Sequence, residues 1–212
     1  MKKTLLLLFL CATLFSCKKS SETPDSGNNS YQPVSKGSYW KYNVTGPSGT
    51  SESIVTMTGY QIKIEGRDYY QYTTTIAGIV ASPGTGYFYA ENGVVMSATV
   101  PADGGSLFLK ENAAVGETWI SRTSSGPTAG VITSFPIAEP YSIVVKLIEK
   151  GVSRTVAGRT FKNVIHTQHS LQLNSGSTTQ LEDYYIAKGV GMIEAKSTDG
   201  TVGSILVDYA IK

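Results

Sequence analysis

The sequence predicts an all-β protein, folded as an antiparallel meander that forms a sandwich or a barrel-like body. Two observations support this prediction. Apolar residues recur at every second position in several stretches, and no stretch of the body shows the sustained 3.6-residue apolar period of a helix. Glycine-containing turn signals separate these stretches at intervals too short for the crossovers that parallel strands need. We expect little or no helix apart from the signal peptide.

Residues 1–16 have the form of a secretory signal peptide. Two lysines at positions 2 and 3 precede an apolar run from 4 to 15, which is shorter than the roughly 20 residues of a membrane-spanning helix. The sequence Leu14-Phe15-Ser16-Cys17 resembles the lipobox of bacterial lipoproteins. That resemblance implies cleavage before Cys17 and lipid attached to Cys17.

Processing at Cys17 changes the composition of the mature chain. Cys11 leaves with the signal peptide, so no thiol remains for a disulfide, a nucleophile or a metal site. Loss of Lys2 and Lys3 leaves 16 basic against 16 acidic residues, without the basic footprint that nucleic-acid binding needs. Residues 17–30 are then the lipidated cysteine and a flexible polar tether. Residues 31–212 form a single β domain.

Strands of the body are expected from the alternating pattern and the turn signals between them. They lie near 38–45, 51–58, 59–65, 68–77, 85–91, 94–100, 106–110, 117–123 and 129–135. Six more run from 141 to 211, with turns at 150–151, 157–158, 174–176, 188–189 and 199–200. On the strand that begins at Phe161 the odd positions are the more apolar. His169 is therefore expected to be half-buried with its hydrogen bonds satisfied, and His166 to be solvated on the other face.

Four landmarks occur in the same order in two halves of the body, about 31–112 and 113–212. They are Gly37-x-x-Trp40 with Gly116-x-x-Trp119, Gly66-Arg67 with Gly158-Arg159, Tyr87-Phe88-Tyr89-Ala90 with Tyr184-Tyr185-Ile186-Ala187, and the apolar strands 107–109 and 205–207. The shared order predicts an internal duplication. Pairing of the two halves would cover their apolar faces and open edges. We expect Trp40 and Trp119 to lie in the core.

Catalytic and metal-binding patterns are missing from the sequence. His166 and His169 lie three apart on a strand, so they point to opposite faces and cannot hold one metal ion together. Glu182 and Asp183 are neighbours on a strand and cannot act as a glycosidase pair. There is no Gly-x-Ser-x-Gly and no His-Glu-x-x-His motif. We expect no metal, no cofactor and no enzymatic activity.

Tyrosine is abundant, with 13 residues that cluster in the predicted strands. The candidate ligand-binding residues are Tyr69, Tyr87, Tyr89, Tyr184 and Tyr185. Exposed tyrosines on a flat sheet could stack on sugar rings. The alternative interpretation is that they are ordinary strand residues that pack on cross-strand neighbours.

The whole chain also resembles the small outer-membrane lipoproteins of Bacteroidota-type bacteria. The resemblance is carried by Cys17-Lys18-Lys19, the polar tether, the Gly-x-x-Trp motifs and the stretch from Tyr184 to Gly191. It implies a lipid anchor in the outer membrane, facing either the periplasm or the surface, and no catalytic residue. The expected function is a non-catalytic binding module for a glycan, a peptide or an apolar small molecule. The alternatives are a structural or assembly partner in an outer-membrane complex and, less favoured, a hydrolase.

Overall fold

The structure, a computed structural model, describes residues 29–78, 83–125 and 139–212. The signal peptide, Cys17, most of the tether and the strand expected at 129–135 lie outside these ranges. The first half holds β1 (Tyr39–Gly46), β2 (Gly49–Ile64), β3 (Arg67–Ile76), β4 (Gly84–Glu91), β5 (Val94–Ala98) and β6 (Ser106–Lys110). The second holds β7 (Thr118–Ser124), β8 (Tyr141–Val156), β9 (Arg159–Leu173), β10 (Thr178–Ala187), β11 (Gly191–Ser197) and β12 (Gly203–Ala210).

Helix is confined, in the part of the chain that the structure describes, to one short 3-10 turn, η1 (Pro101–Asp103). None of the described residues forms a helix of the length and hydropathy needed to cross a membrane. The all-β prediction is therefore confirmed.

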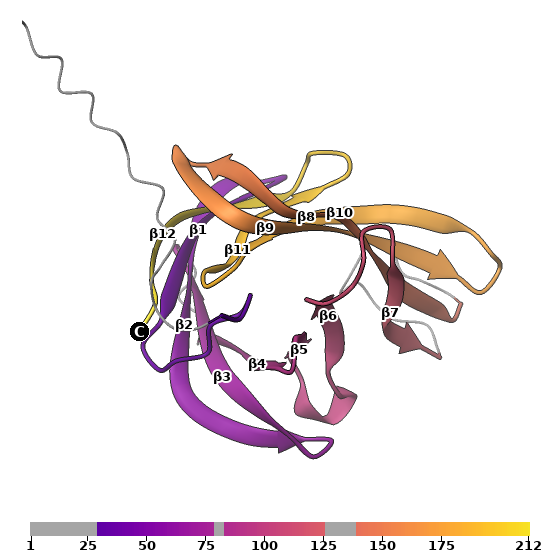
Figure 1. The fold of residues 1–212 in the computed structure, drawn as a ribbon, viewed down its shortest axis with the longest axis horizontal. Coiled ribbons are helices and arrows are strands. Elements are labelled where there is room, and N and C mark those ends of the chain that lie inside the picture. The colour runs from indigo at the N-terminus through magenta and orange to yellow at the C-terminus, as the bar shows by residue number, and fades with distance from the viewer. Residues whose placement is uncertain (1–28, 79–82, 126–138) are drawn as a thin grey trace, which may run out of the picture.

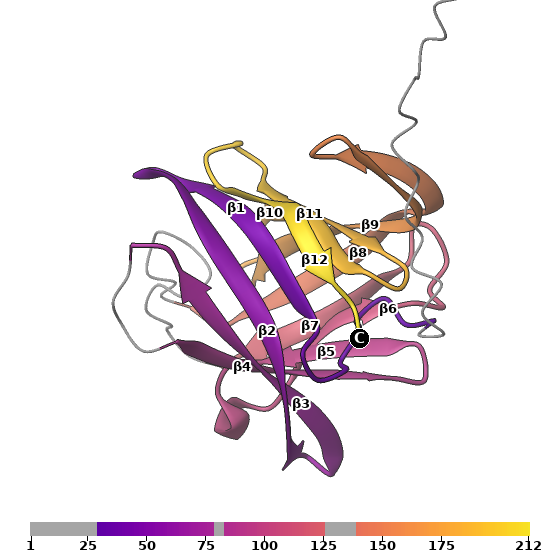
Figure 2. The same cartoon turned by 90° about the vertical axis from the view of Figure 1, so that its left-hand side faces the viewer.

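All twelve strands belong to one antiparallel sheet that curls into a nearly closed barrel (Figure 1). The strand order is β6-β5-β4-β3-β2-β1-β12-β11-β10-β9-β8-β7. β1 pairs with β2 on one side and with β12 on the other, so the first and last strands of the chain are neighbours in the middle of the sheet (Figure 2). β6 and β7 are the two ends of the sheet and lie next to each other in the ring without forming a ladder. We call this gap the seam.

The two halves repeat the same strand pattern. β2 and β8 each have 16 residues, and each is followed by a two-residue turn. Glu65 and Gly66 have φ of 49° and 79°, and Ala157 and Gly158 have φ of 47° and 75°. Positive φ at both positions is the mark of the type I′ turn, whose twist matches that of the flanking strands. These matches favour the internal duplication, which stays a prediction.

Two glycines that the sequence placed at strand ends lie inside long strands. The expected strands 51–58 and 59–65 are one strand, β2, and Gly59 (φ 82°) sits at a bulge where the register with β3 shifts. Gly151 (φ 75°) has the same place in β8, beside register shifts with β9. A bulge needs a residue that tolerates positive φ, which looks like a turn signal in sequence. The second half therefore has five strands after residue 140, not six.

Large apolar side chains fill most of the ring. Trp40 and Trp119 keep only 2% and 5% of their surface exposed, which confirms their expected place in the core. Tyr31 is also buried and packs in the same cluster as Trp119, because the segment before β1 enters the ring (Figure 1). Tyr31 is therefore part of the packed interior.

Candidate functional site

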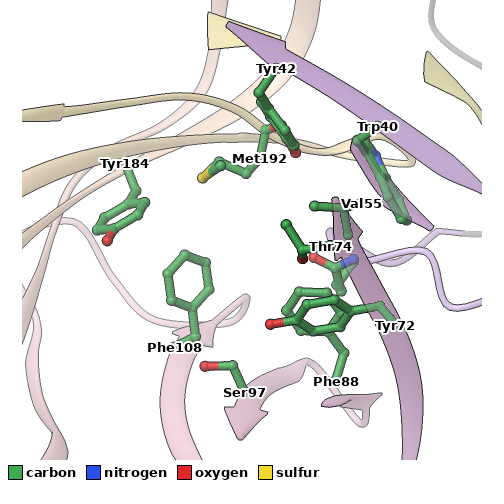
Figure 3. A pocket seen from close by; sticks show the side chains of 11 residues that line it. Trp40, Tyr42, Val55, Tyr72, Thr74, Phe88, Ser97, Phe108, Tyr184 and Met192 are labelled. Atoms are coloured by element: carbon green, nitrogen blue, oxygen red, sulfur yellow. The ribbon is translucent and has the colours of Figure 1, made fainter. Parts of the chain in front are cut away.

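A cavity of about 250 Å³ lies inside the ring, between β1–β6 and the facing strands β10 and β11 (Figure 3). Its walls are mainly aromatic and apolar side chains that point toward one common space. The lining residues are Gln32, Trp40, Tyr42, Val55, Tyr72, Thr74, Phe88, Ser97, Phe108, Tyr184 and Met192. We call it the aromatic cavity.

Strand alternation and one glycine shape this wall. Tyr72 and Thr74 are two apart on β3 and therefore share the interior face. Tyr72 lies opposite Gly86, where a Cβ atom would stand 2.3 Å from the tyrosine ring. Because Gly86 has no side chain, the Tyr72 ring can lie across β4 and stack on Phe88, with 4.4 Å between the ring centres.

The polar atoms of the deepest aromatic residues are already bonded to the backbone. The Trp40 indole Nε1 donates to the Val190 carbonyl oxygen at 2.6 Å, and the Tyr42 hydroxyl donates to the Met192 carbonyl oxygen at 3.0 Å. Burial raises the pKa of Tyr42 and of Tyr72, so both phenols are neutral at physiological pH. The wall therefore presents mainly carbon to the cavity.

A second cavity of about 370 Å³ adjoins the first and lies against the seam. β5, the β5–β6 connection and β6 line one side of it, and β7 to β10 line the other. Its lining residues are Ser97, Ala98, Thr99, Val100, Gly104, Ser106, Phe108, Ser121, Arg122, Ile143, His169, Leu181, Glu182 and Tyr184. Ser97, Phe108 and Tyr184 line both cavities. We call it the seam cavity.

Three rings stand at the boundary between the cavities. Phe108 and Tyr184 meet edge to face with 5.1 Å between ring centres, and His169 lies 4.5 Å from Tyr184 and 5.4 Å from Phe108. Such contacts are typical of aromatic packing.

Charged and polar groups gather in the seam cavity. His169 is 7% exposed, and its Nε2 has no hydrogen-bond partner within the described residues. Burial lowers the pKa of His169 to about 4, with a smaller opposing effect from Asp183, so the imidazole is neutral at pH 7. The Tyr184 hydroxyl donates to the Glu182 carboxylate, and burial raises the pKa of Tyr184.

Of the five tyrosines predicted from sequence, Tyr184 lines the cavities and the other four lie elsewhere. Tyr69 is fully buried and packs with Tyr87 and Tyr89 under the tip of the β2–β3 hairpin. Its hydroxyl lies 3.5 Å from the sulfur of Met96. Tyr87 and Tyr89 flank Phe88, so they are on the face opposite the aromatic cavity. These three residues form a packed cluster and not an open row.

Tyr185 is buried on the outer side of β10, beneath the β8–β9 hairpin. The guanidinium carbon of Arg154 lies 3.3 Å from the centre of its ring, and the Arg154 Nε is 2.6 Å from the Glu194 carboxylate. His166 stacks on Tyr185 with 4.3 Å between ring centres, and its Nε2 is 2.8 Å from Asp183 Oδ1. This arrangement closes Tyr185 off from solvent.

The expectation that His166 is solvated is wrong, because only 13% of its side chain is exposed. The curled hairpin covers a face that sequence alone would assign to solvent. The two histidines do lie on opposite faces, as predicted. Across 29–78, 83–125 and 139–212 there is no group of three His, Cys, Asp or Glu residues that could hold a metal ion.

Most cavity residues were not predicted from sequence as ligand-binding residues. They are the aromatic and sulfur-containing side chains Trp40, Tyr42, Tyr72, Phe88, Phe108 and Met192. The signal that could have found them is their alternation with polar residues along each strand. Trp40 was expected to be core, yet one side of its ring borders empty space.

Comparisons with known proteins give no family. No family model matches the chain, and no curated protein matches it. A putative lipoprotein from Parabacteroides distasonis is similar in structure, with a TM-score of 0.49 and 9% identity over 86% of this chain and 99% of that one. A putative exported protein from Bacteroides fragilis, described as having a YmcC-like fold, is similar with a TM-score of 0.44 and 11% identity over 84% of this chain and 97% of that one.

Proposed function

We propose that the protein is a lipid-anchored envelope protein that binds an apolar small molecule in the aromatic cavity, without catalysis. The observation that carries this proposal is the cavity itself. Its walls are carbon-rich, and the polar atoms of Trp40 and Tyr42 are bonded to the backbone. A ligand there gains mainly by removing apolar surface from water, about 25 cal/mol per Å².

An apolar ligand is favoured over a glycan or a peptide. A glycan would need accessible aromatic faces with free hydrogen-bonding groups, but Tyr69, Tyr87 and Tyr89 are packed together. A peptide added to a sheet edge would need room beside an edge strand, and the hydrogen bond from Trp119 to the Leu107 carbonyl oxygen joins the edge strands β7 and β6 across the seam. The envelope location is supported by the lipobox and by Cys17.

An assembly role would require a broad exposed apolar patch. The large exposed hydrophobic residues of the described chain include Tyr60, Val115, Ile120 and Ile205, which lie on β2, the β6–β7 connection, β7 and β12. This scatter favours the cavity as the functional feature.

Titration of the mature chain with the neutral fluorescent probe N-phenyl-1-naphthylamine tests the proposal. Thr74→Trp places an indole in the aromatic cavity and is expected to weaken probe binding at least tenfold. Thr75→Trp is the matched control, because Thr75 is the next residue of β3 and is exposed. Equal probe affinity in both variants and in the unmodified protein would show that the cavity is not the binding site.

A further inference from the structure

The seam cavity differs chemically from the aromatic cavity that it adjoins. It contains hydroxyl groups from Ser97, Ser106 and Ser121, a guanidinium group, a carboxylate and a neutral imidazole. The two spaces share Phe108 and Tyr184 as a common wall. One ligand that occupied both would therefore need an apolar part and a polar part.

Two polar groups of the seam cavity have no hydrogen-bond partner among the residues that the structure describes. The Nε2 atom of His169 is buried without a hydrogen bond, and such orphaned groups are rare in folded proteins. Arg122, half-buried on β7, makes no hydrogen bond or ion pair with any residue that the structure describes. Both side chains can donate to an acceptor placed between β7 and β9.

The charges that face this space come from two strands. Glu182 on β10 lies opposite His169 in the β9–β10 ladder and is the acidic residue of the lining. The Glu182 carboxylate accepts a hydrogen bond from the Tyr184 hydroxyl, and this bond disperses the negative charge of the carboxylate. Arg122 is the cation of the lining and has no such partner within the described part of the chain. An arginine fork matches the paired oxygens of a carboxylate or phosphate.

We propose that the seam cavity is a head-group site for an anionic amphiphile. The oxyanion would bind Arg122 and His169, and the apolar part would pass Phe108 and Tyr184 into the aromatic cavity. This inference rests on the proposed function and adds the chemical class of the ligand. It also accounts for the unpaired seam, because a ladder between β6 and β7 would narrow the space that the head group occupies.

Calorimetric titration of the mature chain with four twelve-carbon amphiphiles tests the proposal. Dodecanoate, dodecyl phosphate, dodecanol and dodecylamine have the same tail and differ in the head. We expect at least one anion to bind tenfold or more tightly than both the alcohol and the amine. The anion that binds more tightly, dodecanoate or dodecyl phosphate, shows whether the natural head group is a carboxylate or a phosphate.

Variants then locate the head group. Arg122→Gln is expected to reduce anion affinity to that of the alcohol, while N-phenyl-1-naphthylamine binds as before. Arg122→Lys keeps the charge and should retain part of the preference. Arg159→Gln is the control, because Arg159 is paired with Asp208 away from both cavities.

The alcohol binding as tightly as both anions in the unmodified protein would overturn the head-group site, even if the Arg122→Gln variant failed to fold. An unchanged anion preference in a folded Arg122→Gln variant would overturn it too. Failure of the proposed function looks different, because then neither the neutral probe nor dodecanol binds.

Discussion

The indole nitrogen of Trp119 donates a 3.2 Å hydrogen bond to the carbonyl oxygen of Leu107, which joins β7 to β6 across the seam. Lys110 on β6 lies 5.8 Å from the centre of the Trp119 ring and 3.6 Å from Glu117. The equivalent tryptophan of the first half, Trp40, stands on β1, which forms a ladder with β12. At the seam, where no backbone ladder connects β6 and β7, the Trp119 side chain therefore joins the two strands.

Trp119→Phe should lower the free energy of unfolding by about 1 kcal/mol, because it removes this hydrogen bond and keeps most of the ring. Trp119→Ala and Trp40→Ala should each cost about 3–5 kcal/mol, since both side chains are buried. Urea unfolding followed by circular dichroism measures these changes. Unshifted midpoints for both alanine variants would contradict the placement of the two tryptophans in the core.

Gly151→Ala should destabilise the protein by about 1–2 kcal/mol, because φ is 75° at this position and an L-residue is strained there. The new methyl group would meet nothing within 4 Å, so no steric clash adds to this cost. Gly59→Ala should cost more, since its Cβ would lie 2.7 Å from the Lys36 side chain as well. Gly46→Ala is the control, with ordinary φ and open space around it. Thermal melts compare the three, and equal losses at all three sites would refute the bulge assignment.

The stability of the protein should fall as pH decreases from about 6.5 to about 4. The pKa of His169 is lowered from 6.5 to about 4 by burial, so in this window the unfolded chain binds a proton that the folded chain excludes. The loss amounts to about 3 kcal/mol, and above pH 6.5 the effect is constant.

His169→Phe should remove this part of the pH dependence. Urea midpoints at pH 7.0 and 4.5, measured for the variant and the unmodified protein, isolate the contribution of one side chain from the other titrating groups. Parallel pH profiles for the two proteins would mean that His169 is accessible to protons in the folded state.

Arg154→Met should destabilise the β8–β9 hairpin by about 1–2 kcal/mol, because the variant loses the stacking on Tyr185 and the hydrogen bond to Glu194. Both partners of that ion pair are largely buried, with 29% and 18% of their side chains exposed. Arg159→Met is the matched control and should cost less than about 1 kcal/mol, since Arg159 lies 5.7 Å from the Tyr209 ring and 3.6 Å from an exposed aspartate.

Hydrogen exchange would locate the effect of Arg154→Met. Amides of the hairpin tip should exchange faster in that variant, while those of β1 and β12 stay protected. Faster exchange throughout the ring would show that the hairpin is part of the global folding unit and not a local flap.

Matching sequence motifs of the two halves do not place their side chains alike. Tyr87 and Tyr184 begin corresponding motifs, yet Tyr184 faces the cavities and Tyr87 lies on the side opposite Phe88. The register of β10 against β9 shifts between Gln180 and Glu182, where Leu181 is an extra residue of β10 that precedes Tyr184. One extra residue in a strand moves every later side chain to the other face.

The sequence by itself determined the all-β class, the antiparallel meander, the burial of Trp40 and Trp119, and the turn before Arg159. These features follow from period-two patterning and from residues that tolerate positive φ, which are properties of short segments. Only the tertiary structure decided which face of each strand borders the cavities and that β6 and β7 stay unpaired. The face that a side chain takes depends on the bulges that precede it in its strand. The closure of the barrel depends on the twist and tilt that twelve strands accumulate around the ring.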